Sequence, residues 1–373
     1  MVIILLSIVS LLSVYSSSQA LAFSGNSNRT FYLLVKQLFI LGFGIFTIIL
    51  THLVPYKVFS RLSQLLLFIV LPLLLLTLLF GRGNADANRW LEMPGGFTIQ
   101  TSDLAKIILV IFVARILSIK QDKLLKIKEA YLPIIIATLL VCGLILPANF
   151  STSALLFATI FLLMFIGRMP LKFLLLTVAG GVVAFSLFLA LSSAFNISNR
   201  QKTWESRVKN FLNASEEGVN NYQVNRAKVA IVNGGIIGRG PGNSMQKEKL
   251  PQANSDFIYA IIVEEYGLIG GIVVLFLYMW LLFRTAMIVR RSNRTFPALA
   301  AMGLAMLIVF QAMVNMAVAV NLVPVTGQTL PYISSGGSSV LFTSIALGVI
   351  LSASWGIEEE LKIQKENEEE ENE

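Results

Sequence analysis

The chain alternates between long apolar runs and short polar connections. Leu65–Phe80 reads LLLFIVLPLLLLTLLF and contains no charged residue. An apolar stretch of about 20 residues can cross the roughly 30 Å hydrocarbon core of a bilayer as a helix. The pattern predicts ten such spans, at 2–22, 32–53, 60–80, 103–119, 131–147, 152–168, 171–195, 256–283, 296–320 and 334–356. Because lipid offers no hydrogen-bond partners to the backbone, we predict an all-α polytopic membrane protein.

Composition agrees with this pattern and excludes several kinds of site. Of the 373 residues, 55% are hydrophobic and 13% are charged, whereas about a quarter of a soluble domain is charged. Cys142 is the only cysteine and His52 the only histidine, so an intrachain disulfide and a Cys/His metal cluster are both excluded. The sequence contains no nucleic-acid-binding module, so we attribute its basic character to membrane topology.

The net charge of +8 is unevenly distributed along the chain. Residues 358–373 hold nine glutamates and two lysines, which leaves 27 of the 29 basic residues and 12 of the 21 acidic residues elsewhere. We therefore expect a membrane domain over 1–357, followed by a disordered acidic tail in the cytoplasm. Four connections carry most of the positive charge: Lys57/Arg61, 115–128, Arg168/Lys172 and 284–294. The positive-inside rule places these four loops and both termini on the cytoplasmic side.

The first apolar segment allows two interpretations. Residues 2–22 end in Ala20-Leu21-Ala22, as a cleaved signal peptide does, but no basic residue precedes their apolar core. We therefore expect a retained first helix. The other nine spans have the same orientation in either case.

One connection on the outer side, at about 196–255, is long and rich in polar residues. Structureless loops of this length are uncommon unless they are functional, so we expect short amphipathic helices at the outer surface and an active site among them. Its segment 233–243, NGGIIGRGPGN, is either a flexible turn or a set of backbone amides that bind phosphate oxygens. Four of the loop's basic residues are candidates for binding a diphosphate or lipid headgroups: Arg207, Lys228, Arg239 and Lys247.

Three carboxylates lie at or inside the eighth span. Asp256 stands where the long loop meets the span, so it either stabilises the helix start or accepts a proton or holds a cation. Glu264 and Glu265 lie deeper, and Glu264 is on nearly the same helix face as Asp256. A charged residue at mid-membrane costs roughly 2.5–3.5 kcal/mol on insertion scales. We therefore expect the two glutamates to face the interior, either paired with polar partners or taking part in chemistry.

Two further features fall inside or between apolar segments. Asp103 and Lys106 are three residues apart, so they share one face of the fourth span and either neutralise each other or mark a functional site. The segment Val323–Phe342, VPVTGQTLPYISSGGSSVLF, interrupts an apolar context with prolines, glycines and serines that include Ser338 and Ser339. Irregular backbone of this kind either lines a cavity or allows close helix packing.

Three of these stretches together resemble the SEDS family (shape, elongation, division and sporulation), which comprises the membrane glycosyltransferases RodA and FtsW. They are NRWLEMPGGFTIQTSDLAKI, GGIIGRGPGNSMQKEKLPQANSDFIYAIIVEEYGLIGG and NLVPVTGQTLPYISSGGSSVLF. The resemblance covers essentially the whole chain. The ARILSIKQ and PANFST stretches are more similar to FtsW than to RodA, although Asn149 stands where the family often has an acid.

The resemblance implies a fold, an activity and site residues. The fold would be the SEDS fold of ten helices with one large extracytoplasmic loop, in the bacterial inner membrane. The activity would be polymerisation of lipid II into glycan strands with undecaprenyl diphosphate as leaving group, during septal wall synthesis. Asp256 and Glu248 match the family's catalytic loop acids, and Asp103 and Lys106 match its intramembrane pair.

The resemblance also implies ligands and partners. Asp256 would act as base or hold a divalent cation, Mg²⁺ or Mn²⁺; Glu264, Glu265, Ser338 and Ser339 would support the site. The partners would be a class B penicillin-binding protein, a transpeptidase, and other divisome membrane proteins. The alternatives are a RodA-like elongation polymerase, a flippase or transporter for the same lipid, and an inactive scaffold.

Overall fold

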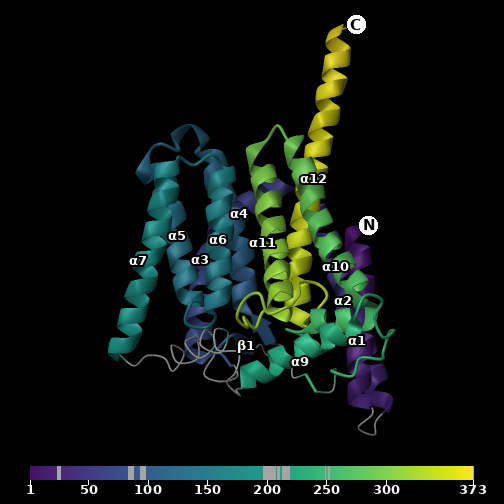
Figure 1. Ribbon diagram of the computed structural model, residues 1–373. Coiled ribbons are helices and arrows are strands. Elements are labelled where there is room, and N and C mark those ends of the chain that lie inside the picture. The colour runs from purple at the N-terminus through teal and green to yellow at the C-terminus, as the bar shows by residue number, and fades with distance from the viewer. Residues whose placement is uncertain are drawn as a thin grey trace. The chain divides into compact units, whose positions relative to one another are not determined.

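The computed structural model describes residues 1–22, 27–82, 88–92, 98–195, 207, 211, 219–247, 249–250 and 253–372. Helices dominate these residues (Figure 1). The α-helices are α1 (Val2–Ala22), α2 (Ser27–Leu53), α3 (Tyr56–Phe80), α4 (Thr101–Ile119), α5 (Leu132–Ile145), α6 (Phe150–Ile166), α7 (Leu171–Phe195), α9 (Val219–Gly234), α10 (Ile258–Arg290), α11 (Thr295–Ala319) and α12 (Gly337–Asn372). Short elements complete them: η1 (Gln121–Lys123), the π-helix η2 (Ile127–Tyr131), β1 (Trp90–Glu92) and β2 (Thr98–Gln100).

Each of the ten predicted spans coincides with one of these helices, and the all-α membrane fold is confirmed. Within the described ranges, seven helices are long and apolar enough to cross a membrane, and α1 and α6 contribute shorter apolar helices at Val2–Ser16 and Phe150–Ile166. α4 also matches a predicted span but carries three charged residues, Asp103, Lys106 and Arg115. The remaining helix, α9, lies in the long loop where a short helix is expected.

The chain divides into two compact units, and α2, α10, α11 and α12 each contribute to both. Unit 1 comprises Met1–Ile45, Asn199–Leu281 and Ile308–Thr343. Unit 2 comprises Phe46–Ser198, Leu282–Leu307 and Ser344–Glu373.

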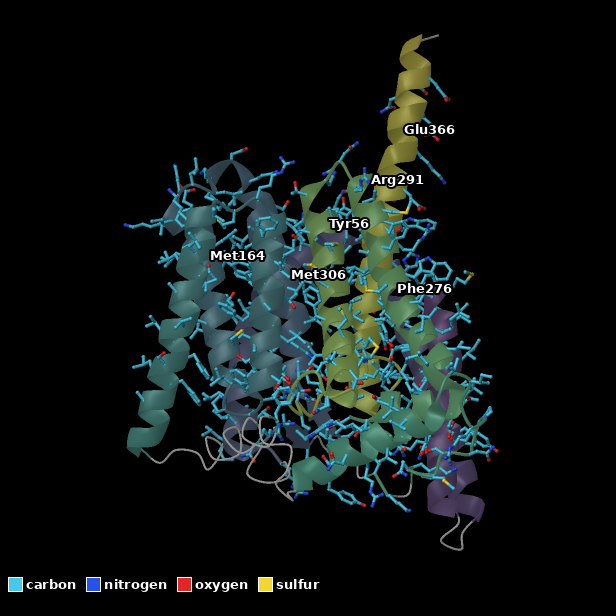
Figure 2. The ribbon with its side chains drawn as sticks, in the orientation of Figure 1. Tyr56, Met164, Phe276, Arg291, Met306 and Glu366 are labelled. Carbon is cyan, nitrogen blue, oxygen red and sulfur yellow. The ribbon has the colours of Figure 1, made fainter. Side chains whose placement is uncertain are left out.

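Unit 2 is built around α4, which packs against α3, α5 and α6. Almost every residue of α4 between Ala105 and Leu117 is buried. Apart from Asp103, Lys106 and Arg115, its sequence between residues 103 and 117 is apolar on all sides, as expected of a helix surrounded by others. Met164 of α6, which is labelled in Figure 2, is fully buried.

A two-stranded antiparallel sheet, which the sequence pattern did not predict, precedes α4. Trp90 pairs with Gln100 and Glu92 with Thr98. The sheet leads directly into α4, whose N-cap residue is Gln100, and no side chain caps the helix start. Thr101 instead donates its hydroxyl to Thr77 of α3 at 2.9 Å.

The acidic end of the chain is helical, where the sequence predicted disorder. α12 continues to Asn372, and Glu366 lies on this distal part of the helix in Figure 2. Glutamate, lysine, glutamine and leucine are all good helix formers. Glu358 and Lys362 also have the i,i+4 spacing, acid first, that favours helix formation.

Candidate active site

α10, which carries the two deep glutamates, is broken at Gly267 in unit 1. Gly267 has φ 69° and ψ −172°, so the hydrogen bonds that a continuous helix would form across it are missing. The freed groups pair instead with the glycine loop, which we define as residues 233–243. The pairs, donor first, are Arg239 N with Glu264 O (3.0 Å), Gly240 N with Glu265 O (2.9 Å), Leu268 N with Gly235 O (2.9 Å) and Ile269 N with Ile236 O (3.3 Å).

Glycine is required on both sides of this junction. A Cβ atom on Gly267 would lie 2.2 Å from the carbonyl oxygen of Ile236, and one on Gly238 would lie 2.2 Å from that of Glu265. Gly238 also has a positive φ of 91°, which side chains disfavour. The amides of Gly238, Arg239 and Gly240 all donate to protein carbonyls. The glycine loop is therefore an ordered partner of α10, and these amides are not presented to a phosphate.

Glu264 is fully buried and holds the turn that follows the glycine loop. Its carboxylate accepts the Ser244 hydroxyl and the backbone amides of Met245 and Gln246, both at 3.2 Å. A buried carboxylate is tolerated when several donors satisfy it. These contacts are those of a supporting residue that fixes the path of residues 244–246.

Glu265 is also buried, and one of its oxygens accepts the hydroxyl of Ser16 from α1. Ser16 belongs to a polar row on α1 that includes Ser7 and Ser10. Ser10 donates to the carbonyl of Ile333 at 3.0 Å. Glu265 and this row therefore join α1 to the interior of unit 1.

The four basic candidates have different surroundings. Lys247 is buried, and its ammonium group donates to the carbonyl of Gly242 at 2.6 Å. Arg239 is exposed on the glycine loop and donates to the carbonyl of Asn233 at 3.3 Å. Lys228 is half-buried on α9. The structure places Arg207, the fourth candidate, at Asp256.

Asp256 lies in the turn 253–257, immediately before α10, and is half-buried. Six residues of helix, about 9 Å, separate the first residue of α10 from Glu264. The backbone carbonyl of Asp256 accepts from the side-chain amide of Asn315 on α11 at 2.8 Å, and the same amide donates to Gln328 O at 2.7 Å. α11 therefore anchors the turn that carries Asp256.

The interrupted segment 323–342 anchors the same turn from another side. Ser334 donates its hydroxyl to the carbonyl of Ser255 at 2.6 Å, and the Ser335 amide donates to the carbonyl of Asn254 at 2.9 Å. Ser339 exchanges a 3.2 Å hydrogen bond with Thr329, whereas the buried hydroxyl of Ser338 has no hydrogen-bond partner. The segment thus packs against the aspartate turn through irregular backbone.

Arg207 interacts electrostatically with Asp256 and is held by the 323–342 segment. One guanidinium nitrogen donates to the carbonyl of Val325 at 3.1 Å, while its buried Nε has no hydrogen-bond partner. Burial lowers the pKa of Arg207, and the nearby Asp256 carboxylate acts in the opposite direction. An arginine remains protonated at physiological pH in spite of such shifts. The site therefore places a carboxylate near a cation that the 323–342 segment holds in position.

Asp103 and Lys106 form the expected ion pair in unit 2. Lys106 Nζ lies 2.8 Å from Asp103 Oδ1, and the two side chains are 7% and 9% exposed respectively. Asn149, where the resembled family often has an acid, caps α6 by accepting the Thr152 amide at 3.3 Å. Glu248, the other predicted catalytic acid, lies outside the described residues.

Several residues that were not predicted from the sequence bind the backbone or the carboxylates of the site. Gln311 and Asn315 are four residues apart on α11 and bind the carbonyls of the 323–342 segment. Two amide side chains at this spacing inside an apolar run indicate a polar helix face, so the sequence could have predicted their role. Ser16 and Ser244 gave no such signal, because an isolated serine is common in both helices and turns.

A divalent cation at Asp256 is compatible with the donor atoms present. Mg²⁺ and Mn²⁺ prefer carboxylate and carbonyl oxygens. Asn315, whose amide nitrogen contacts the Asp256 backbone, has a buried Oδ1 with no hydrogen-bond partner. In the described part of the chain, no group of three or more His, Cys, Asp or Glu side chains is arranged to hold a metal ion.

Comparisons with known proteins bear on this geometry. Residues 1–358 match a family model named for FtsW, RodA and SpoVE and described as a cell cycle protein. The chain is 34% identical over 367 residues to the protein of Trichlorobacter lovleyi named "probable peptidoglycan glycosyltransferase FtsW", covering 95% of this chain and 93% of that protein. It is 30% identical over 364 residues to the Bacillus subtilis protein of the same name, with 94% and 88% covered.

Two solved structures have a similar fold. One is a chain of a peptidoglycan synthase complex, from a study of how polymerization and crosslinking are coordinated, with a TM-score of 0.71, 25% identity, and coverage of 94% of this chain and 97% of that one. The other is the rod shape determining protein RodA of Thermus thermophilus, with a TM-score of 0.66, 24% identity, and coverage of 95% and 94%.

The junction at Gly267 makes a prediction about stability. In Gly267→Ala the new methyl group meets the Ile236 carbonyl in a disfavoured backbone conformation, so we expect a loss of about 2 kcal/mol or more. Thermal unfolding in detergent measures the change. The control is Gly143→Ala on α5, where no atom lies within 4 Å and alanine should be neutral or stabilising. Equal melting temperatures for both variants would contradict the proposed junction.

The buried ion pair makes a second prediction. Lys106→Met leaves the Asp103 charge buried without its cation, which should cost about 3–5 kcal/mol of stability. The double variant Asp103→Leu/Lys106→Met removes both charges and should recover most of that loss. The control is Arg82→Gln in the exposed Arg82–Glu92 pair, whose side chains are 76% and 42% exposed and where a loss below about 1 kcal/mol is expected. If Lys106→Met unfolds at the same temperature as the control, the pair does not stabilise unit 2.

Proposed function

This chain belongs to the FtsW, RodA and SpoVE family of cell cycle proteins, and on that premise we propose that it polymerises lipid II into glycan strands at the outer membrane–water boundary. It is a membrane protein and a peptidoglycan glycosyltransferase, as its relatives at 30–34% identity are named. The observation that carries the proposal is the place of Asp256 at the start of a membrane helix, in a turn held by the same 323–342 segment that binds Arg207.

Asp256 is the residue we assign to proton transfer. The 4-hydroxyl of the acceptor sugar attacks the anomeric carbon of the lipid-linked donor, and its proton passes to the Asp256 carboxylate. A glycosidic bond forms as the bond from the anomeric carbon to the diphosphate oxygen breaks. General-base assistance of this kind is worth typically 10²–10⁴-fold in rate. A divalent cation, if bound by Asp256 and Asn315 Oδ1, would supply positive charge toward the same diphosphate.

Arg207 is the residue we assign to the leaving group. Undecaprenyl diphosphate departs as an anion, so a fixed cation nearby stabilises the transition state. The guanidinium of Arg207 is held at one nitrogen by the Val325 carbonyl, which fixes the cation near Asp256. Arg239 and Lys228 could add positive charge, whereas the ammonium group of Lys247 is already bonded to Gly242.

The depth of the carboxylates supports the same assignment. Asp256 precedes α10 and is half-buried, whereas Glu264 and Glu265 lie inside the helix and are engaged by serines. A lipid-linked substrate requires apolar surroundings for its hydrocarbon chain and water for its sugars. A residue at the start of a membrane helix lies at the boundary between the two. We therefore assign chemistry to Asp256 and support to the two glutamates.

Polymerisation of lipid II by the purified protein with its partner tests the proposal. Asp256→Asn keeps the side-chain size but cannot accept the proton, so we expect at least a 100-fold loss of rate. The control is Glu92→Gln, an exposed acid on β1, which should polymerise within twofold of the wild type.

Three results would contradict the assignment. An Asp256→Asn protein that folds, binds its partner and polymerises at the normal rate would exclude Asp256 as the base. A wild-type protein that moves lipid II across liposomes and makes no glycan would favour the transporter alternative. Normal growth of cells that depend on Asp256→Ala would favour a scaffold.

The cellular role follows the same relatives. The protein would lie in the inner membrane with both termini in the cytoplasm and work at the septum, with a class B penicillin-binding protein and other divisome membrane proteins. Support comes from the FtsW names of its relatives and from its likeness to a chain of a peptidoglycan synthase complex. A fluorescent fusion in dividing cells should gather at mid-cell. A dispersed pattern along the side wall would favour the RodA-like role instead.

A further inference from the structure

Unit 2 contains a large polar cavity that the glycosyltransferase reaction does not use. The cavity has a volume of about 620 Å³ and lies where the first turn of α3, the last turns of α4 and the start of α11 meet. Four cationic side chains line it: Lys57, Arg61, Arg115 and Arg294. None of the described residues lining this basic cavity is acidic.

Arg115 lines the basic cavity and is held in place by a neighbouring side chain. Its side chain is half-buried on α4, and one terminal nitrogen donates to the Ser60 hydroxyl at 3.1 Å. The buried Nε of the same guanidinium has no hydrogen-bond partner. An anion in the cavity would reach the guanidinium at its other terminal nitrogen and offset the surrounding positive charge.

The start of α11 adds to the positive potential. Thr295, the first residue of this 25-residue helix, lines the basic cavity. The N-terminal end of a helix carries partial positive charge and unpaired amides, which favour phosphate groups.

A neighbouring basic cluster in the same unit provides a contrast. Lys120, Lys123 and Lys126 surround Glu129, with nitrogen–oxygen distances of 4.0, 3.0 and 3.2 Å. Positive charge there is neutralised within the chain. The basic cavity has no such carboxylate among its described lining residues, so an anion that enters it meets four cations and no described acid.

The surface beside the basic cavity suits acyl chains. Lys57, Arg61, Leu65 and Phe68 are spaced by four, four and three residues, so they lie along one face of α3. Leu65 is 58% exposed and Phe68 76% exposed. This α3 stripe therefore begins with two cations at the cavity and continues as exposed apolar surface toward the middle of the span. An anionic headgroup with attached hydrocarbon chains matches both parts.

We propose that the basic cavity binds the phosphate of an anionic glycerophospholipid, with Arg115 as a donor in its wall and the acyl chains against the α3 stripe. The guanidinium of Arg115 bonds the phosphate oxygens, and Lys57, Arg61 and Arg294 surround the headgroup. The site is separate from Asp256 and does not depend on the function proposed for it.

Binding of defined lipids to the purified full chain tests the proposal. Native mass spectrometry in detergent would compare phosphatidylglycerol with phosphatidylcholine of the same acyl chains. We expect phosphatidylglycerol to bind at least tenfold more tightly. Arg115→Gln should weaken that binding at least tenfold. The control Lys172→Gln removes one exposed charge at the start of α7, outside the cavity, and should change binding less than twofold.

Further variants and a competing ligand separate the contributions of the headgroup and of the acyl chains. Because Arg115 is half-buried, the exposed Arg61→Gln serves as a second variant, with an expected weakening of at least threefold. Leu65→Ser/Phe68→Ser should weaken binding of the lipid but not of inorganic phosphate. Equal affinity for the two lipids, or unchanged affinity in both arginine variants, would overturn the proposal. Displacement of phosphatidylglycerol by equimolar inorganic phosphate would also overturn it, because the acyl chains would then contribute nothing.

Discussion

The structure of unit 1 depends on one constraint, that backbone hydrogen bonds cannot remain unmade inside a membrane span. α10 breaks at Gly267, and the break would leave two carbonyls and two amides without partners. The glycine loop supplies all four partners through its own backbone. Because the two strands of backbone come so close, Gly238 and Gly267 cannot carry side chains. A loop distant in sequence is thereby fixed to the helix that carries the site.

This junction also organises the polar side chains of the unit. Glu264 stands next to the break and binds the turn at Ser244, and Glu265 binds Ser16 of α1. The glutamates therefore stabilise the interior, and the half-buried Asp256 remains at the helix start with Arg207. A carboxylate there can receive a proton from a sugar hydroxyl, and an arginine there can face a departing diphosphate. We assign different roles to the three acids because they differ in their depth along the helix and in the donors that each one contacts.

Much of this arrangement could be predicted from the sequence, because apolar runs and isolated charges carry most of the information in a membrane chain. The ten helices, the Asp103–Lys106 pair and the inward position of the deep glutamates follow from spacing and from the cost of burying charge, whereas their supporting role was implied only by the family resemblance. The glycine loop could not be interpreted in the same way, since its partners lie about thirty residues later and only the fold brings them together. Arg207 could not be distinguished from the other basic residues of the loop by sequence, because its contact with the 323–342 segment depends on the fold. The acidic tail was predicted to be disordered because of its high charge. The structure describes it as a helix to Asn372, in agreement with the good helix propensity of its residues.

The most direct test of this account is hydrogen–deuterium exchange of the full chain in lipid nanodiscs, read at the amides of the glycine loop and of Leu268 and Ile269. The account predicts that Arg239 and Gly240 exchange as slowly as Leu268 and Ile269, because the four amides are bonded in one junction. It also predicts that Gly267→Ala exposes both segments together and then the turn that carries Asp256. Fast exchange of the glycine loop beside a protected α10 would contradict the account, since the loop would then be a free surface turn.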